Sequence, residues 1–100
     1  MHCGLCYGTA EDPKWDSSGD IETPFVGQWH VFSLDWHKDH VKWYVDGKVV
    51  KEIVAGYVPD EPMYLVISNS VSSELGAAGT PDKDTNFPNS LDIDYVRIWK

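Results

Sequence analysis

The chain has 100 residues, of which 42% are apolar and 13% aromatic, so it is one domain at most and too apolar for a disordered segment. Asp and Glu number 16 against 8 Lys and Arg, and the formal charge of −8 argues against a nucleic-acid backbone or an anionic membrane surface as partner. No apolar run is long enough for a helix that spans a bilayer, and the first residues lack the pattern of a signal peptide, so we expect a soluble chain without an export signal of its own.

Residues 1–8 mix apolar and small side chains and are predicted to form a strand. They include Cys3 and Cys6, which are too few and too close in sequence to build a disulfide framework, so no redox compartment follows from them. Residues 9–27 contain 5 acidic residues and 2 prolines, a composition that favours neither helix nor strand. We expect a long surface loop there, and loops of this length are often functional.

The next stretch is predicted to be a set of antiparallel strands. Residues 28–36 and 41–45 alternate in the period of two that is typical of strands. Asp46 and Gly47 follow, and Asp-Gly between apolar runs is a strong hairpin signal because Gly adopts positive φ without strain. Residues 48–55 are therefore predicted to return antiparallel to the preceding strand.

Two further strands are predicted at residues 63–71 and 91–99, with a second surface loop at 72–89 between them. Apolar residues nowhere recur at helical spacing, so the sequence predicts an all-β fold, an antiparallel β-sandwich or barrel formed by one domain over residues 1–100. Four tryptophans on the alternating segments are expected in its core: Trp29, Trp36, Trp43 and Trp99.

Four blocks stand in a fixed order along the chain: WHVFSLDW at 29–36, WYVDG at 43–47, EPMYLV at 61–66, and FP at 87–88 followed by DIDYVRIW at 92–99. Together they resemble the C-terminal half of glycoside hydrolase family 16. Residues 1–8 also resemble the strand that comes soon after the catalytic strand of that family.

The resemblance implies a partial concanavalin A-like jelly roll with a glycan cleft on its concave sheet. Family members are mostly secreted or periplasmic retaining endo-glycosidases that act on β-glucans such as laminarin or on galactans such as agar, and they require no cofactor for the reaction. A polysaccharide or oligosaccharide is therefore the implied partner. Their chemistry uses a Glu-x-Asp-x-x-Glu motif, whose two glutamic acids lie roughly 5 Å apart as nucleophile and acid.

This motif is absent from the chain. Its nearest match, Asp92-x-Asp94, has Arg97 in the third position, and a guanidinium can neither donate a proton nor form a glycosyl ester. We therefore assign no catalytic residue and expect the chain to begin just after the catalytic strand and to be inactive alone.

Sugar binding needs aromatic faces and a few hydroxyl or amide groups. Trp15 is isolated in the acidic loop and is the best candidate for a platform at the rim of the cleft. By resemblance, Asn69 lies on the strand that carries a cleft-lining Asn, and His2 and Tyr7 line the cleft if the first strand is placed correctly.

The resemblance also offers a structural Ca²⁺ at Asp94, held together with backbone oxygens. The alternative is a surface carboxylate that pairs with Arg97 or a lysine.

A second metal hypothesis is zinc at Cys3-x-x-Cys6 with His37-x-x-His40, although the His spacing is shorter than is usual for zinc. The alternative is two reduced thiols and two exposed turn histidines.

Three functions follow from these observations. The chain is the C-terminal portion of a family 16 glycosidase, a non-catalytic lectin-like carbohydrate-binding module, or a remnant that associates with a second copy of itself or with a missing N-terminal half. In a sandwich each inner face is covered by strands from both halves of the chain. We therefore expect the isolated chain not to be a stable monomer.

Overall fold

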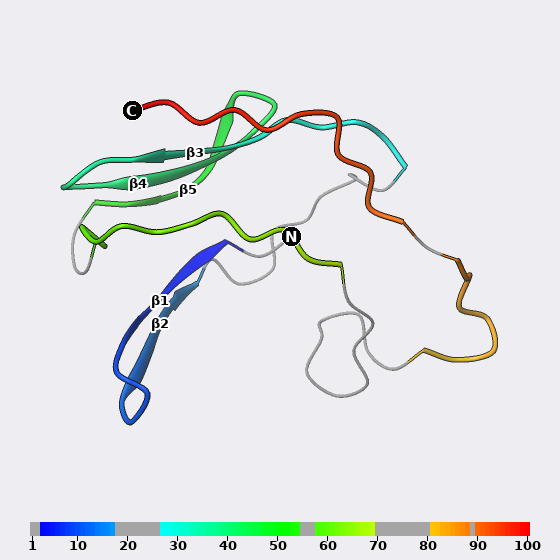
Figure 1. The fold of residues 1–100 in the computed structure, drawn as a ribbon, viewed down its shortest axis with the longest axis horizontal. Coiled ribbons are helices and arrows are strands. Elements are labelled where there is room, and N and C mark those ends of the chain that lie inside the picture. Colours follow the sequence, from blue (N-terminus) through cyan, green and yellow to red (C-terminus); the bar gives the residue numbers. More distant parts are fainter. Residues whose placement is uncertain (1–2, 18–26, 55–57, 70–80, 89) are drawn as a thin grey trace. The chain divides into compact units, whose positions relative to one another are not determined.

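The computed structural model describes residues 3–17, 27–54, 58–69, 81–88 and 90–100 of the chain. Its strands are β1 (Gly4–Gly8), β2 (Pro13–Ser17), β3 (Phe32–Trp36), β4 (Val41–Val45) and β5 (Lys48–Ile53) (Figure 1). All strand pairs are antiparallel, and no described residue is helical, which confirms the predicted all-β class. Accordingly, nothing in these ranges forms a helix that could cross a membrane. The chain divides into two compact units, Met1–Pro62 with all of these strands and Met63–Lys100.

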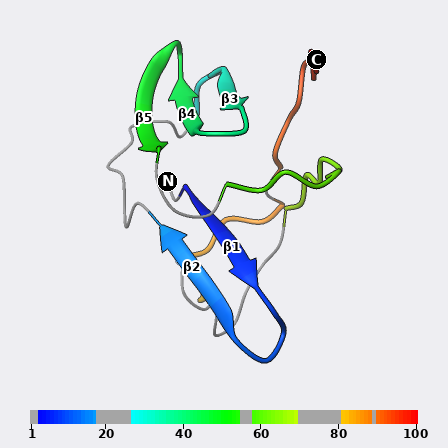
Figure 2. The ribbon, with the colours of Figure 1, turned by 90° about the vertical axis from the view of Figure 1, so that its left-hand side faces the viewer.

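The first two strands form a hairpin of their own (Figure 2). Its turn follows Gly8, whose φ of 93° lies in the left-handed region, and a Cβ at this position would collide with the carbonyl oxygen of Asp12. Thr9 and Asp12 then close the turn with reciprocal backbone hydrogen bonds of 3.3 and 3.2 Å. Only glycine therefore fits the position from which the chain turns back.

The position of β2 corrects the prediction of one continuous surface loop over residues 9–27. Residues 13–17 pair with β1 along their whole length, from Gly4 opposite Ser17 to Gly8 opposite Pro13. The tight turn supplies a partner strand close in sequence, and the ladder hydrogen bonds outweigh the poor strand propensity of this polar segment. Residues 18–26 lie outside the described residues.

The strands β3, β4 and β5 form an antiparallel meander, as predicted, although β3 begins at Phe32 rather than at residue 28. Asp46 and Gly47 form the two-residue turn between β4 and β5, with φ of 49° and 78°. Positive φ at both positions is the type I′ geometry that matches the twist of a hairpin. The Asp-Gly signal in the sequence is therefore confirmed.

One extra residue in β5 decides which side chain faces the core. The β4–β5 register shifts at Val50, which forms a β-bulge. Beyond the bulge Ile53 lies opposite Val41, whereas an unbroken register would place Glu52 there. Directly opposite residues point to the same face, and Val41, Val45 and Ile53 are only 1%, 4% and 5% exposed. The bulge thus brings an isoleucine instead of a carboxylate into the buried cluster.

The four tryptophans predicted to be core residues are mostly exposed, which corrects that expectation. Trp29 and Trp99 are 70% and 79% exposed, Trp36 is 40% exposed, and Trp43 is half-buried. Alternation marks a face as apolar, but the face is buried only when a second layer packs on it, and the described residues supply no such cover to Trp29 or Trp99. The Trp36 indole instead donates a hydrogen bond of 2.7 Å to the backbone oxygen of Pro59.

In the unit Met63–Lys100, neither of the predicted strands at 63–71 and 91–99 forms a strand within the described residues. Alternating side chains favour an extended backbone, but a strand also needs a neighbour that exchanges backbone hydrogen bonds with it. Residues 81–88 are irregular apart from a turn in which Thr85 N donates to Asp82 O at 3.1 Å. The other residues of the predicted loop at 72–89, and residues 70–71, are outside the described residues.

Candidate functional site

Trp15 presents its indole from β2, directly opposite Cys6 of β1. Its side chain is strongly exposed, at 74%. It borders an open depression of about 240 Å³ on the β1–β2 hairpin, which is lined by Cys3, Gly4, Leu5, Cys6, Trp15, Asp16 and Ser17. The depression thus combines an accessible aromatic face with the Ser17 hydroxyl on the same face of β2, and both kinds of group contact sugar rings.

Tyr7 is half-buried and lies opposite Lys14, one residue further along the hairpin. Neighbouring residues of a strand point to opposite faces, so Tyr7 projects away from the face that carries Cys6 and Trp15. It does not line the depression. The structure therefore does not bring Tyr7 together with Trp15.

The sequence predicts two further sugar-binding residues, His2 and Asn69. His2 lies outside the described residues. Asn69 is exposed and belongs to the second unit, Met63–Lys100. Their roles stay predictions that rest on the family resemblance.

The residues around Asp94 provide little that would hold calcium. Ca²⁺ takes six to eight oxygen ligands. Asp94 is exposed, and the described part of the chain gathers no group of three His, Cys, Asp or Glu side chains that includes it. The guanidinium of Arg97 lies over the Tyr95 ring at 4.7 Å. A calcium ion at Asp94 would rest mainly on backbone oxygens, and this site stays a prediction.

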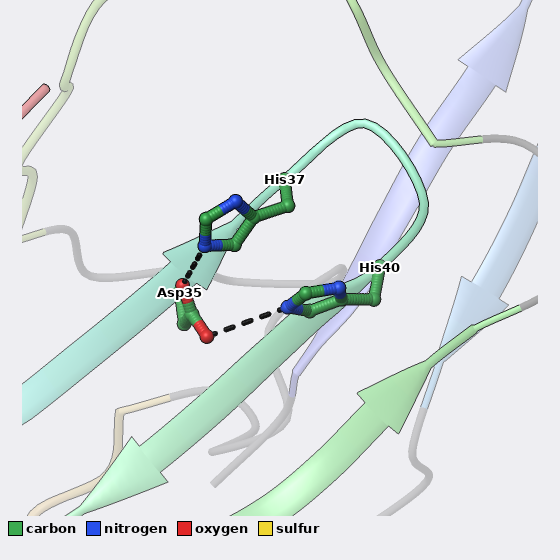
Figure 3. Close-up of side chains that lie close together, drawn as sticks. All are labelled: Asp35, His37 and His40. Carbon is green, nitrogen blue, oxygen red and sulfur yellow. Dashed lines mark hydrogen bonds and ion pairs between the residues drawn. The ribbon is translucent and has the colours of Figure 1, made fainter.

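A different group of metal-ligating side chains converges at the β3–β4 turn. Asp35, His37 and His40 each place a ligand atom within 4.8 Å of the others (Figure 3). His37 Nε2 lies 2.9 Å from Asp35 Oδ1, and His40 Nε2 lies 3.4 Å from Asp35 Oδ2. The rings of the two histidines are 4.7 Å apart, between centroids. One carboxylate thus bridges two imidazoles at the end of a hairpin.

The surroundings of this cluster fix its geometry. The turn is closed by a backbone hydrogen bond of 2.9 Å from His37 N to His40 O. On its far side, His40 Nδ1 lies 2.8 Å from Asp39 Oδ1, and this hydrogen bond is the main cause that lowers the pKa of the Asp39 carboxyl. Lys42 lies opposite Asp35 in the sheet and pairs with Glu52 at 3.0 Å, which raises the pKa of Lys42.

The cluster differs from the zinc site considered in the sequence. The structure brings His37 and His40 together, but neither Cys3 nor Cys6 belongs to the group among the described residues. The third side chain of the group is Asp35, which the sequence analysis did not identify. Its signal was the spacing Asp-x-His-x-x-His across a strand end and a short turn, where a hairpin folds the three side chains onto one another.

Comparison with known proteins gives several relatives. Glucan endo-1,3-beta-glucosidase A1 of Niallia circulans is 33% identical over 100 residues, which cover 84% of this chain and 14% of the relative. Glucan endo-1,3-beta-glucosidase of Cryptopygus antarcticus is 25% identical over 113 residues, which cover 95% of this chain and 42% of the relative. Beta-glucanase of Rhodothermus marinus is 23% identical over 94 residues, which cover 82% of this chain and 32% of the relative. This chain therefore spans less than half the length of these relatives.

No solved structure matches the chain. The sequence model of "Glycosyl hydrolases family 16", in contrast, matches residues 6–97, which include the β1–β2 hairpin, the β3–β5 meander and most of the second unit. The antiparallel strands agree with part of a jelly roll, and the match extends over nearly the whole chain. The chain therefore belongs to glycosyl hydrolases family 16.

Proposed function

We propose that the chain is the C-terminal portion of an endo-acting glycosidase that hydrolyses β-glucan when its catalytic strand is present. Family membership and relatives named glucan endo-1,3-beta-glucosidase and beta-glucanase support this substrate class. The Glu-x-Asp-x-x-Glu motif does not occur in the sequence. Because a retaining glycosidase needs both carboxyl groups, we expect no turnover from the chain alone.

The observation that carries the proposal is the exposed indole of Trp15 on the β1–β2 hairpin. Burying such a ring against a pyranose removes apolar surface from water, and the Ser17 hydroxyl, two residues further along β2 on the same face, offers a partner for a sugar hydroxyl. Asp16, the next residue of β2, points to the opposite face, where its Oδ1 lies 2.9 Å from Lys51 Nζ. In this proposal Trp15 is a glucan-binding platform and has no catalytic role.

The test compares two exposed tryptophans in glucan binding. Trp15→Ala should weaken the binding of laminarin, a soluble β-1,3-glucan, by about tenfold or more, as expected for an aromatic anchor. Trp29→Ala is the matched control, because Trp29 is similarly exposed, at 70%, but belongs to a different segment. Calorimetric titration of the 100-residue chain measures both variants. Equal affinities of the two variants, or no binding by the unmodified chain, would contradict the role of Trp15.

A second candidate function is a non-catalytic carbohydrate-binding module. It is favoured by the presence of an aromatic platform in a chain that contains no catalytic motif. Reading the coding sequence upstream of Met1 separates the two functions. An in-frame Glu-x-Asp-x-x-Glu on an apolar strand supports the glycosidase, whereas a stop codon or an unrelated sequence supports the binding module.

A further inference from the structure

The β3–β4 turn gathers one carboxylate and two imidazoles, the ligand types that hold zinc and its neighbours in proteins. We propose that Asp35, His37 and His40 bind a divalent transition cation of the Zn²⁺ class. The site is separate from the glucan platform, since its residues belong to β3 and to the turn after it, while Trp15 belongs to β2. The inference does not depend on the proposed function.

The positions of the ligand atoms fit such an ion. Bonds of 2.0–2.1 Å at tetrahedral angles place ligand atoms roughly 3.4 Å apart. The two separations between Asp35 oxygens and imidazole Nε2 atoms are 2.9 and 3.4 Å, and all three ligand atoms lie within 4.8 Å of one another. Side-chain rotation is therefore enough to complete the site, and the backbone of the turn can stay as it is.

The orientation of the imidazole rings also suits a metal ion. Both Nε2 atoms face the Asp35 carboxylate, at 2.9 and 3.4 Å. A cation at this point takes the two Nε2 lone pairs and a carboxylate oxygen as ligands, and any proton that these atoms carried leaves to solvent. For His40, the other ring nitrogen, Nδ1, faces Asp39 at 2.8 Å.

Asp39 gives this arrangement the outer shell that metal-binding histidines usually have. A carboxylate that accepts the second N–H of a ligating imidazole fixes its tautomer and makes the metal-binding nitrogen more basic. Here Asp39 stands in that position behind His40, and the hydrogen bond from His37 N to His40 O holds the backbone of both histidines. The turn therefore orients the imidazoles before the ion arrives.

Neighbouring charges do not oppose a cation. Lys42, which lies across the sheet from Asp35, pairs with Glu52, so its positive charge is balanced. Lys38 is exposed in the turn and stands between Asp35 and Asp39 in the sequence. The His37, Asp35 and His40 side chains are 62%, 41% and 23% exposed, so an ion can enter from solvent and keep water as its remaining ligand.

The first experiment titrates the 100-residue chain with Zn²⁺ in a Cys6→Ser background, which removes the exposed thiol as a competing ligand. We expect one Zn²⁺ per chain. Asp39→Asn should weaken binding by about tenfold, the cost of losing an outer-shell partner. His37→Gln and His40→Gln should each weaken it more than Asp39→Asn does. His30→Gln, which removes an imidazole that pairs with Asp46 and lies outside the cluster, should leave the affinity unchanged.

Co²⁺ binding to the unaltered chain tests the ligand set without any substitution. Nitrogen and oxygen ligands at low coordination number give visible d–d absorption without a thiolate charge-transfer band, and Zn²⁺ should displace this signal. A thiolate band would assign the metal to the cysteines and overturn the proposal. Zn²⁺ binding that survives both His37→Gln and His40→Gln, or no saturable binding at millimolar Zn²⁺, would overturn it as well.

Discussion

Asp46 combines a backbone role with a charge role at one position of the β4–β5 turn. Its φ of 49° is tolerated by Asp and Asn far better than by other residues with a Cβ. Its carboxylate accepts a hydrogen bond of 3.0 Å from Val31 N and lies 2.7 Å from His30 Nδ1. The hydrogen bond from Val31, followed by that from His30, lowers the pKa of the Asp46 carboxyl below its ordinary value of 3.8.

This lowered pKa predicts how the stability of the meander depends on pH. A carboxyl whose pKa is lower in the folded state stabilises the fold above its unfolded pKa, and this contribution is lost as the pH falls through the folded pKa. Asp46→Asn keeps the turn conformation but removes the charge, which also acts on Lys48. We expect the melting temperature of Asp46→Asn to lie below that of the unmodified chain at pH 6. The difference between the two melting temperatures should narrow below pH 3.8.

Thermal unfolding followed by circular dichroism at several pH values measures this difference. Asp82→Asn is a suitable control, because Asp82 lies in an exposed turn of the other unit. A gap between Asp46→Asn and the unmodified chain that stays constant from pH 7 to pH 2 would contradict the role of the Asp46 charge.

Among the elements, β5 depends on the residue that the bulge at Val50 brings opposite Val41, which is Ile53. Ile53→Glu places there the kind of side chain that an unbroken register would bring with Glu52. A carboxylate without a cationic partner in this buried cluster should cost about 3 kcal/mol or more in the free energy of unfolding. We expect this substitution to abolish the meander, as measured by urea unfolding.

The matched variant is Val50→Ala, which keeps the bulge and removes only part of a half-buried side chain. It should lower the free energy of unfolding by about 1 kcal/mol. If Ile53→Glu and Val50→Ala unfold at the same urea concentration, the side chain at position 53 does not face the buried cluster, and the register shift at Val50 is contradicted.

The sequence predicted elements whose signals are local and missed those that depend on a partner. Asp46-Gly47 predicted its hairpin because the turn conformation resides in those two residues. β2 was missed because its pairing with β1 decides its structure, and the strands predicted at 63–71 and 91–99 lack a ladder within the described residues for the same reason.

The candidate site shows the same division. Trp15 was identified from its isolation in a polar segment, and the structure confirms that its indole is exposed. The pairing of Asp35 with the two histidines requires the hairpin to fold the strand end back, which one-dimensional spacing only suggests. Whether Asn69 or Asp94 takes part in binding depends on long-range contacts that no local pattern specifies.

At the scale of the whole molecule, far more large apolar side chains are exposed than buried among the described residues. Five side chains among the described residues are buried, and all are apolar: Cys3, Val41, Val45, Ile53 and Pro59. In the second unit, Tyr64, Val66, Ile98 and Trp99 are each at least 67% exposed. So much exposed apolar surface in a small chain favours burial against another surface.

We therefore predict that the isolated chain associates at micromolar concentration, either with copies of itself or with the N-terminal half of a complete domain when that half is supplied. Light scattering coupled to size exclusion measures the mass of the chain as a function of concentration. A sharp monomer with a cooperative thermal transition would contradict this prediction.

Cys6 lies directly opposite Trp15 in the β1–β2 hairpin, so a fluorescent dye attached to Cys6 can report on the surroundings of the Trp15 indole. Cys6 is exposed, whereas Cys3 is buried and desolvation raises the pKa of its thiol, so a maleimide dye reacts preferentially with Cys6. The dye then sits on the same face as an indole, which quenches many fluorophores on contact. If Trp15 binds glucan as proposed, the sugar should separate the dye from the indole, and the fluorescence should increase on binding.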